Sequence, residues 1–129
     1  MIALLDTDVL IDCLRGTPAA RSWLSSNAAQ SFQVPGIAAM ELLMGCNNQA
    51  DLKRTQQFLS TFSITWLTEQ ESEQAYLLLA QHRLSSGLSI PDCLIAAMAI
   101  SRSAMLYTFN VRHFQVITGL NVAAPYPRN

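Results

Sequence analysis

IALLDTDVLIDCLRG, residues 2–16, contains the strongest indication of the fold class in this sequence. Residues 2–5 form an apolar run of the length and composition typical of a short buried strand. An apolar helical pattern follows over residues 9–15, and Gly16 ends it. A buried strand that leads directly into a helix predicts the first unit of a parallel α/β sheet.

The rest of the chain continues this alternation of strands and helices. Thr17 with Pro18 begins one helix, while Thr68 and Glu71 make a capping box for a long helix that Gly87 ends. The expected helices cover residues 9–15, 18–26, 37–46, 51–62, 69–86 and 89–103. The expected strands cover residues 2–5, 31–35, 63–67, 104–108 and 121–124. We therefore expect a three-layer α/β/α fold around a short, mainly parallel sheet of four to five strands.

Length and composition predict one domain over residues 1–129, since a chain of 129 residues can bury a sizeable core by itself. Half of the residues are hydrophobic and only 13% are charged, which suggests that a second copy or another protein covers part of the surface. The net charge of -1 provides no global attraction for nucleic acid. Any such binding would depend on local basic patches and on bridging metal ions.

The cysteines and the apolar segments indicate a cytoplasmic protein. Cys13, Cys46 and Cys93 are far apart and lie in apolar helical patterns, which favours buried free thiols over disulfides or a cysteine metal site. The sequence shows neither a basic leader nor an apolar segment long enough to span a bilayer. We expect a protein that is neither exported nor bound to a membrane.

Five of the nine acidic residues lie in apolar surroundings: Asp6, Asp8, Asp12, Glu41 and Asp92. Such carboxylates are costly to desolvate and require a compensating cation or hydrogen-bond donor. Only Arg15 is close to any of them in sequence, so a divalent cation is the simpler partner and a distant arginine the alternative. Asp12 is expected on the surface or paired with Arg15. The other four acids lie near helix starts, where the helix dipole favours them.

The predicted topology brings most of these acids together. In open α/β sheets, functional groups gather at the carboxyl ends of the strands. Asp6 and Asp8 follow the first strand, and Glu41 and Asp92 lie on helices that follow other strands. The segment YTFNVRHF, residues 107–114, adds Thr108, Asn110, Arg112 and His113 at the same edge.

Apolar residues on the helices are expected to pack inward. Ile37, Glu41 and Met44 fall at spacings that share one helical face, and this face should point toward the core. Met40, Met44 and Met98 are interpreted as core-filling residues, although methionine also suits partner surfaces. Trp23 and Trp66, with other apolar residues, could serve either the core or a partner contact.

Four fragments stand in a fixed order along the chain: LLDTDVLIDCLRG (4–16), AAMELLMG (38–45), SIPDCLIAAMAI (89–100) and LYTFNVRHF (106–114). Together they resemble the PIN-domain ribonucleases, most closely the VapC-type toxins of bacterial toxin–antitoxin pairs. The resemblance covers essentially the full length and implies a PIN-like fold. Each fragment alone is a weak signal, and the ordered set is a specific one.

The resemblance implies that Asp6, Glu41 and Asp92 form an acidic core that binds Mg²⁺ or Mn²⁺, with Thr7 helping to hold the loop of Asp6. Two positions depart from the family pattern. Asp8 stands where relatives usually have asparagine, so it is either an extra metal ligand or a helix cap. Asn110 stands where many relatives have aspartate, and it is included among the catalytic residues because its amide oxygen can still coordinate.

The function that the resemblance implies is hydrolysis of RNA phosphodiester bonds by a metal-dependent endoribonuclease, the toxin of a toxin–antitoxin pair. Hard oxygen ligands suit Mg²⁺ or Mn²⁺, which activate water and stabilise phosphate charge. The implied partners are RNA, a VapB-like antitoxin and a second copy of the chain. Substrate contacts are assigned to Thr7, Arg15, Arg112 and His113, with Arg83 as a further candidate.

Other interpretations remain open at this point. Asp6 alone could be a turn residue, Asp92 a first-turn helix acid, and Glu41 half of an ion pair with a distant arginine. A catalytically silent PIN-like module that binds RNA or protein is the main alternative function, because the fourth acidic position is altered. A phosphoacceptor signalling domain is a third, disfavoured because Lys53 is the only lysine and falls in a helical surface pattern.

Overall fold

The structure of the protein, a computed structural model that describes residues 2–128, is built on a five-stranded parallel sheet in the order β3-β2-β1-β4-β5. Residues 1 and 129 of the predicted domain lie outside the described residues. The strands are β1 (Ile2–Leu5), β2 (Ser31–Pro35), β3 (Ser63–Thr65), β4 (Met105–Tyr107) and β5 (Asn121–Ala123). The helices are α1 (Thr7–Arg15), α2 (Pro18–Ser26), α3 (Gly36–Met44), α4 (Gln49–Leu59), α5 (Glu69–Ser86), α6 (Ile90–Ser101) and α7 (Val111–Phe114).

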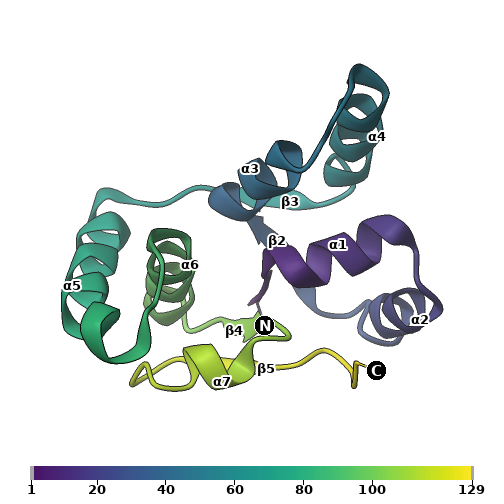
Figure 1. Ribbon diagram of the computed structural model, residues 1–129. Coiled ribbons are helices and arrows are strands. Elements are labelled where there is room, and N and C mark those ends of the chain that lie inside the picture. Colours follow the sequence, from purple (N-terminus) through teal and green to yellow (C-terminus); the bar gives the residue numbers. More distant parts are fainter. Residues whose placement is uncertain (1, 129) are drawn as a thin grey trace.

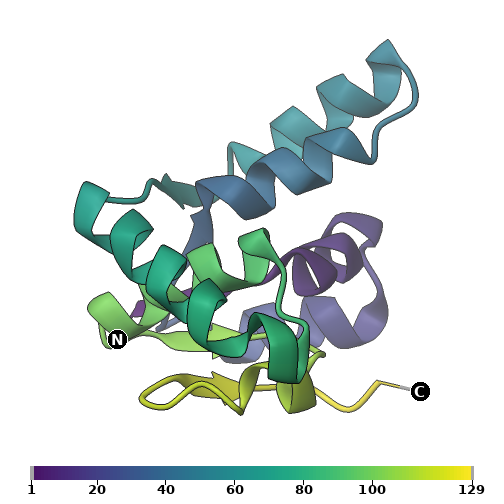
Figure 2. The same ribbon diagram turned by 60° about the vertical axis from the view of Figure 1, so that its left-hand side comes forward.

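The strand order places β1 at the centre of the sheet. The chain first moves outward from β1 through β2 to β3, then returns through α5 and α6 to pair β4 with the other side of β1. Figure 1 shows α5 and α6 on one side of the sheet and α1 and α2 on the other, and Figure 2 agrees from a second direction. In such sheets, the crevice at the carboxyl ends of β1 and β4 is where functional groups collect.

The core lies between the sheet and these helices. Leu4 and Leu5 of β1 and Leu106 of β4 are completely buried. On α6, a run of alanines is buried along with Met98, and these small side chains let the helix approach the sheet closely. Within residues 2–128, every helix is too short or too polar to span a lipid bilayer.

All eleven elements expected from the sequence are present, and four of them have the expected bounds. The strand over residues 31–35, the helix over residues 18–26 and the capping box of Thr68 and Glu71 are confirmed. Gly87 ends α5 with a left-handed backbone, φ 66°, as expected for a C-terminal glycine. The sheet is wholly parallel between its paired strands, where a mainly parallel one was expected.

Several boundaries differ because of capping groups that the pattern did not reveal. α1 begins at Thr7 rather than at residue 9, because Asp6 caps it, and α4 begins before Asp51 because Asn48 accepts from the Asp51 amide. Six expected elements end earlier or begin later in the structure, at one or both ends. They are the helices over residues 37–46, 51–62 and 89–103 and the strands over residues 63–67, 104–108 and 121–124. The short helix α7 was not predicted.

The orientation of α3 was predicted incorrectly. Ala38 and Leu42, one turn apart, form its buried stripe, so Met40 and Met44 fall on the opposite side. Met44 is 85% exposed, and neither methionine fills the core. Figure 2 shows the reason, because the α3 and α4 pair projects away from the rest of the fold.

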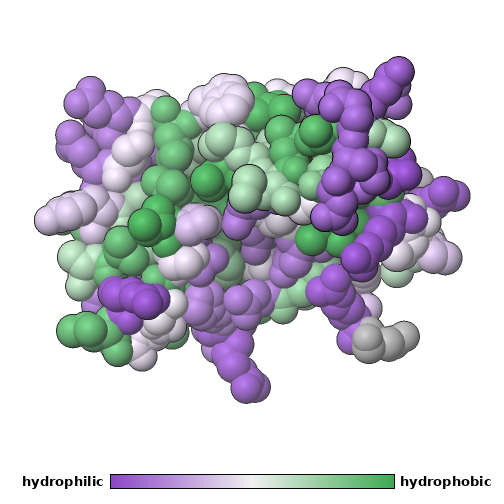
Figure 3. All heavy atoms as spheres, turned by 45° about the horizontal axis from the view of Figure 1, so that its top comes forward, coloured by the Kyte–Doolittle hydropathy of each residue, from purple (hydrophilic) through white to green (hydrophobic). Residues whose placement is uncertain are grey.

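Large apolar side chains are exposed in several places, as the composition led us to expect. Trp66, Tyr76, Leu77 and Leu84 are exposed in addition to the two methionines of α3. Figure 3 shows hydrophobic residues gathered over much of the face that lies at the top of Figure 1, with hydrophilic residues along its edges. An apolar area of this kind is typical of a surface that meets another protein.

Two acids that were interpreted as ordinary are in fact buried ion-pair partners. Glu71 is 2% exposed, and the guanidinium of Arg102 donates two hydrogen bonds of 2.9 Å to its carboxylate. Asp12 is 8% exposed and accepts from Tyr126 and Arg128, so neither a surface position nor a pair with Arg15 is correct. Cys13 and Cys93 are buried as expected, whereas Cys46 is only partly buried, and all three thiols are free.

Candidate active site

Asp6 occupies the end of β1 and caps α1. Its Oδ1 accepts a 2.8 Å hydrogen bond from the backbone N–H of Thr7, which satisfies a donor of the first helical turn. Its Oδ2 accepts a 2.8 Å hydrogen bond from the hydroxyl of Thr108 at the end of β4. The carboxylate is therefore fixed at the junction of the two central strands.

Asp8 lies in the first turn of α1 and is held from the loop after β4. Its Oδ2 accepts from the backbone N–H of Phe109 at 3.1 Å and from the Thr108 hydroxyl at 3.3 Å. Its Oδ1 is buried and has no hydrogen-bond partner among the described residues. Since Asp6 is the cap of α1, the helix-capping interpretation of Asp8 is wrong.

Thr108 is the residue that sequence reasoning placed at this edge without giving it a role. Its side chain is fully buried, and its hydroxyl contacts both Asp6 and Asp8. The backbone N–H of Asn110 donates to the same hydroxyl at 3.0 Å, which orients it toward the carboxylates. The sequence did contain a signal for this role, because Thr108 directly follows β4. A residue at the end of a strand that pairs with β1 lies next to the loop that carries Asp6.

Glu41 joins the site through Thr7. The Thr7 hydroxyl donates a 2.8 Å hydrogen bond to Glu41 Oε1, which ties the start of α1 to the middle of α3. Thr7 thus contacts Asp6 through its amide and Glu41 through its hydroxyl. Beyond Glu41, a cavity of about 640 Å³ opens between α1, α3 and α4, and Arg15 is among the residues that line it.

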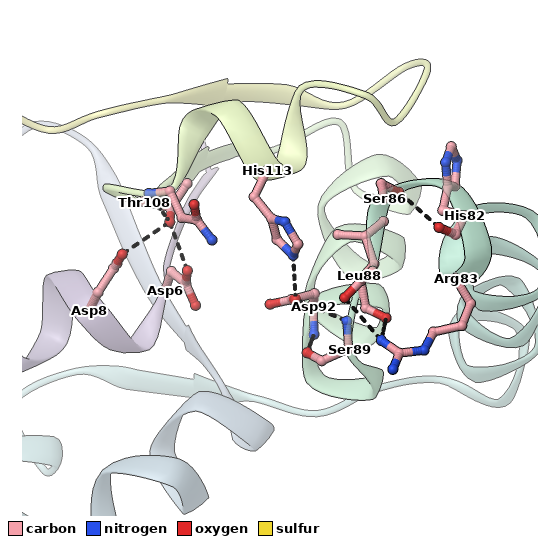
Figure 4. Close-up of polar contacts among 12 residues, drawn as sticks. Asp6, Asp8, His82, Arg83, Ser86, Leu88, Ser89, Asp92, Thr108 and His113 are labelled. Carbon is pink, nitrogen blue, oxygen red and sulfur yellow. Dashed lines mark hydrogen bonds and ion pairs between the residues drawn. The ribbon is translucent and has the colours of Figure 1, made fainter.

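Asp92 faces this group from the start of α6. It shares a capping box with Ser89, in which the Asp92 N–H donates to Ser89 Oγ and the Ser89 N–H donates to Asp92 Oδ2. His113 Nε2 lies 3.0 Å from the same Oδ2. Figure 4 shows Asp6, Asp8 and Thr108 on one side and Asp92 with His113 on the other.

The pKa values of both Asp6 and Asp8 are raised above the ordinary value of an aspartate. Burial, followed by the charge of Asp8 and more weakly that of Asp92, raises the pKa of Asp6 to about 6. Burial also raises the pKa of Asp8, against the hydrogen bond from Phe109. Each ionised carboxylate therefore costs free energy in the protein alone, and a bound cation would offset that cost.

The remaining predicted site residues are exposed. Asn110 is exposed and begins α7 without a side-chain capping hydrogen bond, and Arg112 is exposed on that helix. Arg15 is exposed at the end of α1. Arg83 donates to the carbonyls of Gly87 and Leu88, which ties it to the loop before Asp92. Within residues 2–128, no three carboxylate, imidazole or thiol side chains converge closely enough to hold one ion as they stand.

Comparison with known proteins identifies a PIN domain over residues 3–119. Ribonuclease VapC19 of Mycobacterium tuberculosis is 35% identical over 120 residues, which cover 91% of this chain and 95% of that protein. A solved toxin–antitoxin complex from Klebsiella pneumoniae matches at 32% identity and a TM-score of 0.75, over 96% of this chain and 98% of the other.

The fold agrees with a further solved structure. VapBC2 from Rickettsia felis, bound to a DNA fragment from its promoter, matches with a TM-score of 0.82 at 23% identity, over 96% of this chain and 98% of the other. The family resemblance of the sequence motifs is thus confirmed, as is the PIN-like α/β fold. PIN-domain ribonucleases generally depend on divalent metal ions. This chain belongs to the PIN-domain family, among the VapC ribonucleases.

Proposed function

We propose that this protein is a divalent-metal-dependent endoribonuclease and acts as the toxin of a toxin–antitoxin pair. The observation that carries the proposal is the pair of partly buried carboxylates Asp6 and Asp8, which share the Thr108 hydroxyl, have raised pKa values and lie opposite Asp92. The relatives support it, since one is named a ribonuclease and another was solved as a toxin–antitoxin complex.

The residues present fit a divalent cation. Asp8 Oδ1 is a buried oxygen without a partner, and Asp6 has a raised pKa, and a cation would relieve both. Asp6, Asp8 and Asp92 would hold Mg²⁺ or Mn²⁺, with Glu41 as a further carboxylate, because these ions prefer hard oxygen donors. When bound, such an ion lowers the pKa of a water molecule and stabilises charge on the scissile phosphate.

The chain's own residues orient this carboxylate set. The Thr108 hydroxyl lies 2.8 Å from Asp6 Oδ2 and 3.3 Å from Asp8 Oδ2, so it helps to orient both carboxylates. Thr7 holds Glu41, and Ser89 with His113 fixes Asp92 from the other side. Oriented groups of this kind reduce the reorganisation that substrate binding would otherwise require.

Substrate contacts are proposed at the rim. Arg15, at the end of α1, and Arg112, on α7, are exposed cations and suit phosphate oxygens of RNA. Asn110 is exposed beside the loop that holds Asp8, and its amide can bind a water molecule or a substrate oxygen. His113, which contacts Asp92, is close enough to the site to meet a bound substrate.

The proposed partners are an RNA substrate, a VapB-like antitoxin and a second copy of the chain. The exposed apolar side chains of α3 and α5 supply surface for the two protein contacts. RNA as the substrate assigns the activity to the cytoplasm. We also propose that residues 1–129 form one PIN-like domain, since one sheet carries all the strands described.

A catalytically silent PIN-like binding module is the second candidate. It is favoured by the separation of the carboxylates, because no three ligand side chains within residues 2–128 converge on one point. It is also favoured by Asn110, which carries no charge where the fourth acid of the family stands. The two candidates differ in whether any RNA is cut when metal is supplied in excess.

The test is RNA cleavage with Mg²⁺ or Mn²⁺ by the wild type and by Asp6→Asn and Asp92→Asn. We expect cleavage by the wild type that chelation stops, and no detectable cleavage by either variant. Glu69→Gln, at an exposed acid in the first turn of α5, is the matched control and should cut as well as the wild type. Undiminished cleavage by both aspartate variants would contradict the assigned site, and no cleavage by the wild type would favour the silent module.

A further inference from the structure

The segment of residues 124–128, which follows β5, returns to α1 and contacts it at Asp12. The Tyr126 hydroxyl donates a 2.8 Å hydrogen bond to Asp12 Oδ2, and Arg128 donates a 2.9 Å hydrogen bond to Oδ1. Both oxygens of a nearly buried carboxylate are thus used by this one segment. Removing one donor would leave a buried acceptor unsatisfied, which costs roughly 1–3 kcal/mol.

The same two residues hold the side chain of Phe109. The ring of Tyr126 meets the Phe109 ring edge to face at a centroid distance of 5.2 Å. The Arg128 guanidinium carbon lies 4.1 Å from the Phe109 ring centroid, which is a cation–π contact. Phe109 is therefore packed against residues that are themselves anchored on α1.

Phe109 connects this anchor to the active site. Its backbone N–H donates to Asp8 Oδ2, while Asp8 Oδ1 is left without a partner. Asp8 and Asp12 lie one turn apart on the same face of α1. The 124–128 segment thus closes a ring of contacts from Asp12 through Phe109 to Asp8.

We propose that Tyr126 and Arg128 are positioning residues for the active site, because they hold Phe109 so that its N–H fixes Asp8 and leaves Asp8 Oδ1 free for the divalent cation. This inference rests on the proposed function. It assigns the segment a role in metal affinity, although neither side chain contacts the carboxylates of the proposed metal site. Outer contacts that orient metal ligands usually affect metal affinity strongly.

The positive charge of Arg128 acts on metal affinity in the opposite direction to its positioning role. The direction of the change in affinity when Arg128 is removed therefore tests the inference. A cation near Asp8 repels a divalent ion, so its removal by itself would tighten metal binding. The Arg128 side chain is 45% exposed, and solvent and salt screen its charge. Loss of positioning should therefore dominate, and Arg128→Ala should weaken metal binding.

The experiment measures Mn²⁺ binding to the full chain by isothermal titration calorimetry, without RNA. We expect Arg128→Ala and Tyr126→Phe each to raise the Mn²⁺ dissociation constant by about 10-fold. Tyr126→Phe keeps the ring and the net charge and removes the hydroxyl that donates to Asp12. Arg128→Lys should recover part of the affinity, since an ammonium can also lie over the Phe109 ring.

Lys53→Ala is the control for loss of one positive charge, at an exposed position on α4. It should bind Mn²⁺ as the wild type does. RNA cleavage at saturating Mn²⁺ should be nearly restored in the Tyr126 and Arg128 variants, because their defect lies in holding the metal. Urea denaturation identifies any variant that is not folded, and Tyr126→Phe, the milder change, then carries the test.

The outcomes separate this inference from the proposed function. Wild-type affinity in both variants, or tighter binding in Arg128→Ala, would overturn the positioning role while the wild type still binds Mn²⁺ and cuts RNA. A wild type that neither binds Mn²⁺ nor cuts RNA would overturn the proposed function and this inference with it. Weaker binding that saturating Mn²⁺ does not compensate in cleavage would also count against positioning.

Discussion

Two acids of this protein that lose solvent on folding, the buried Glu71 and the partly buried Asp6, have pKa values shifted in opposite directions. Glu71, between α5 and α6, accepts two hydrogen bonds from Arg102 and one from the Thr68 amide, and these lower its pKa to about 2. Asp6, at the centre of the sheet, accepts only from a hydroxyl and an amide, and burial beside Asp8 raises its pKa to about 6. Both acids lose solvent, and only Glu71 gains a positive charge.

This difference distinguishes an acid with a structural role from acids that no arginine of the described residues contacts by a hydrogen bond. Arg102 also donates to Thr65 and to the carbonyl of Trp66, so the Glu71 pair closes a network that joins α5 to the loop after β3. Within residues 2–128, no arginine is hydrogen-bonded to Asp6 or Asp8; the charge of Arg128, which is paired with Asp12, acts on Asp8 only through space, and Asp8 Oδ1 has no hydrogen-bond partner. A buried carboxylate that its own chain leaves uncompensated indicates a ligand from outside.

The largest loss of stability should come from removing the charge of Glu71 from its ion pair with Arg102. Glu71→Gln would leave the Arg102 guanidinium largely buried and without its counter-charge, and we expect a loss of about 3 kcal/mol in the free energy of unfolding. Urea denaturation at pH 7 measures it. Glu73→Gln, at an exposed position on the same helix, should change the stability by less than about 0.5 kcal/mol.

The pH dependence gives a second readout of the same pair. The folded-state pKa of Glu71 is lowered to about 2 from 4.5, so its contribution is present above pH 4.5 and is lost as the pH falls toward 2. Glu71→Gln should therefore flatten the acid side of the stability profile. A variant as stable as the wild type, with an unchanged acid profile, would show that the pair is not structural.

A smaller change in stability, of opposite sign, is expected for substitution of Asp6. Asp6→Asn removes an uncompensated charge but keeps a good helix cap, so the metal-free protein should gain roughly 1–2 kcal/mol of stability at pH 7.5. The folded-state pKa is raised from 3.8 to about 6, so the contribution of Asp6 is present below pH 3.8 and lost as the pH rises through 6. The gain should therefore vanish near pH 4.

Bound metal should stabilise the wild type more than Asp6→Asn. Mn²⁺ at about ten times its dissociation constant should stabilise the wild type by about 1.4 kcal/mol and Asp6→Asn by much less. Thermal denaturation with and without Mn²⁺ measures both values. A metal-free Asp6→Asn protein that is less stable than the wild type at pH 7.5 would mean that Asp6 is already compensated by its own chain.

Local signals were sufficient to predict most of the fold. The capping box of Thr68 and Glu71, the Thr17 and Pro18 helix start and the Gly87 helix end involve neighbours in sequence, and the structure confirms each of them. Asp6, Asp8 and Thr108 meet at the carboxyl ends of β1 and β4, the edge where the topology predicts them. Thr108 gained a role only once β4 was seen beside β1.

Partners that are distant in sequence could not be predicted. Arg102 lies 31 residues from Glu71 and Arg128 lies 116 residues from Asp12, so no periodicity links them. Asp12 was consequently assigned to the surface, and Glu71 was given a capping role alone. An ion pair with a distant arginine, one of the alternatives for the acids in apolar surroundings, is found for Asp12 with Arg128. Neither Asp6 nor Asp8 forms such a pair among residues 2–128.

The smallest effect is expected at an ion pair that is exposed. Arg54 donates a 3.0 Å hydrogen bond to Asp51 one turn earlier on α4, with an Arg54 side chain that is 71% exposed. Its geometry resembles that of the Glu71 pair in distance, but water already solvates both charges. We expect Arg54→Ala to lower stability by no more than about 0.5 kcal/mol by urea denaturation at low salt, and by less in 0.5 M salt. A loss as large as that of Glu71→Gln would show that pairing alone, without burial, accounts for the contrast between Glu71 and Asp6.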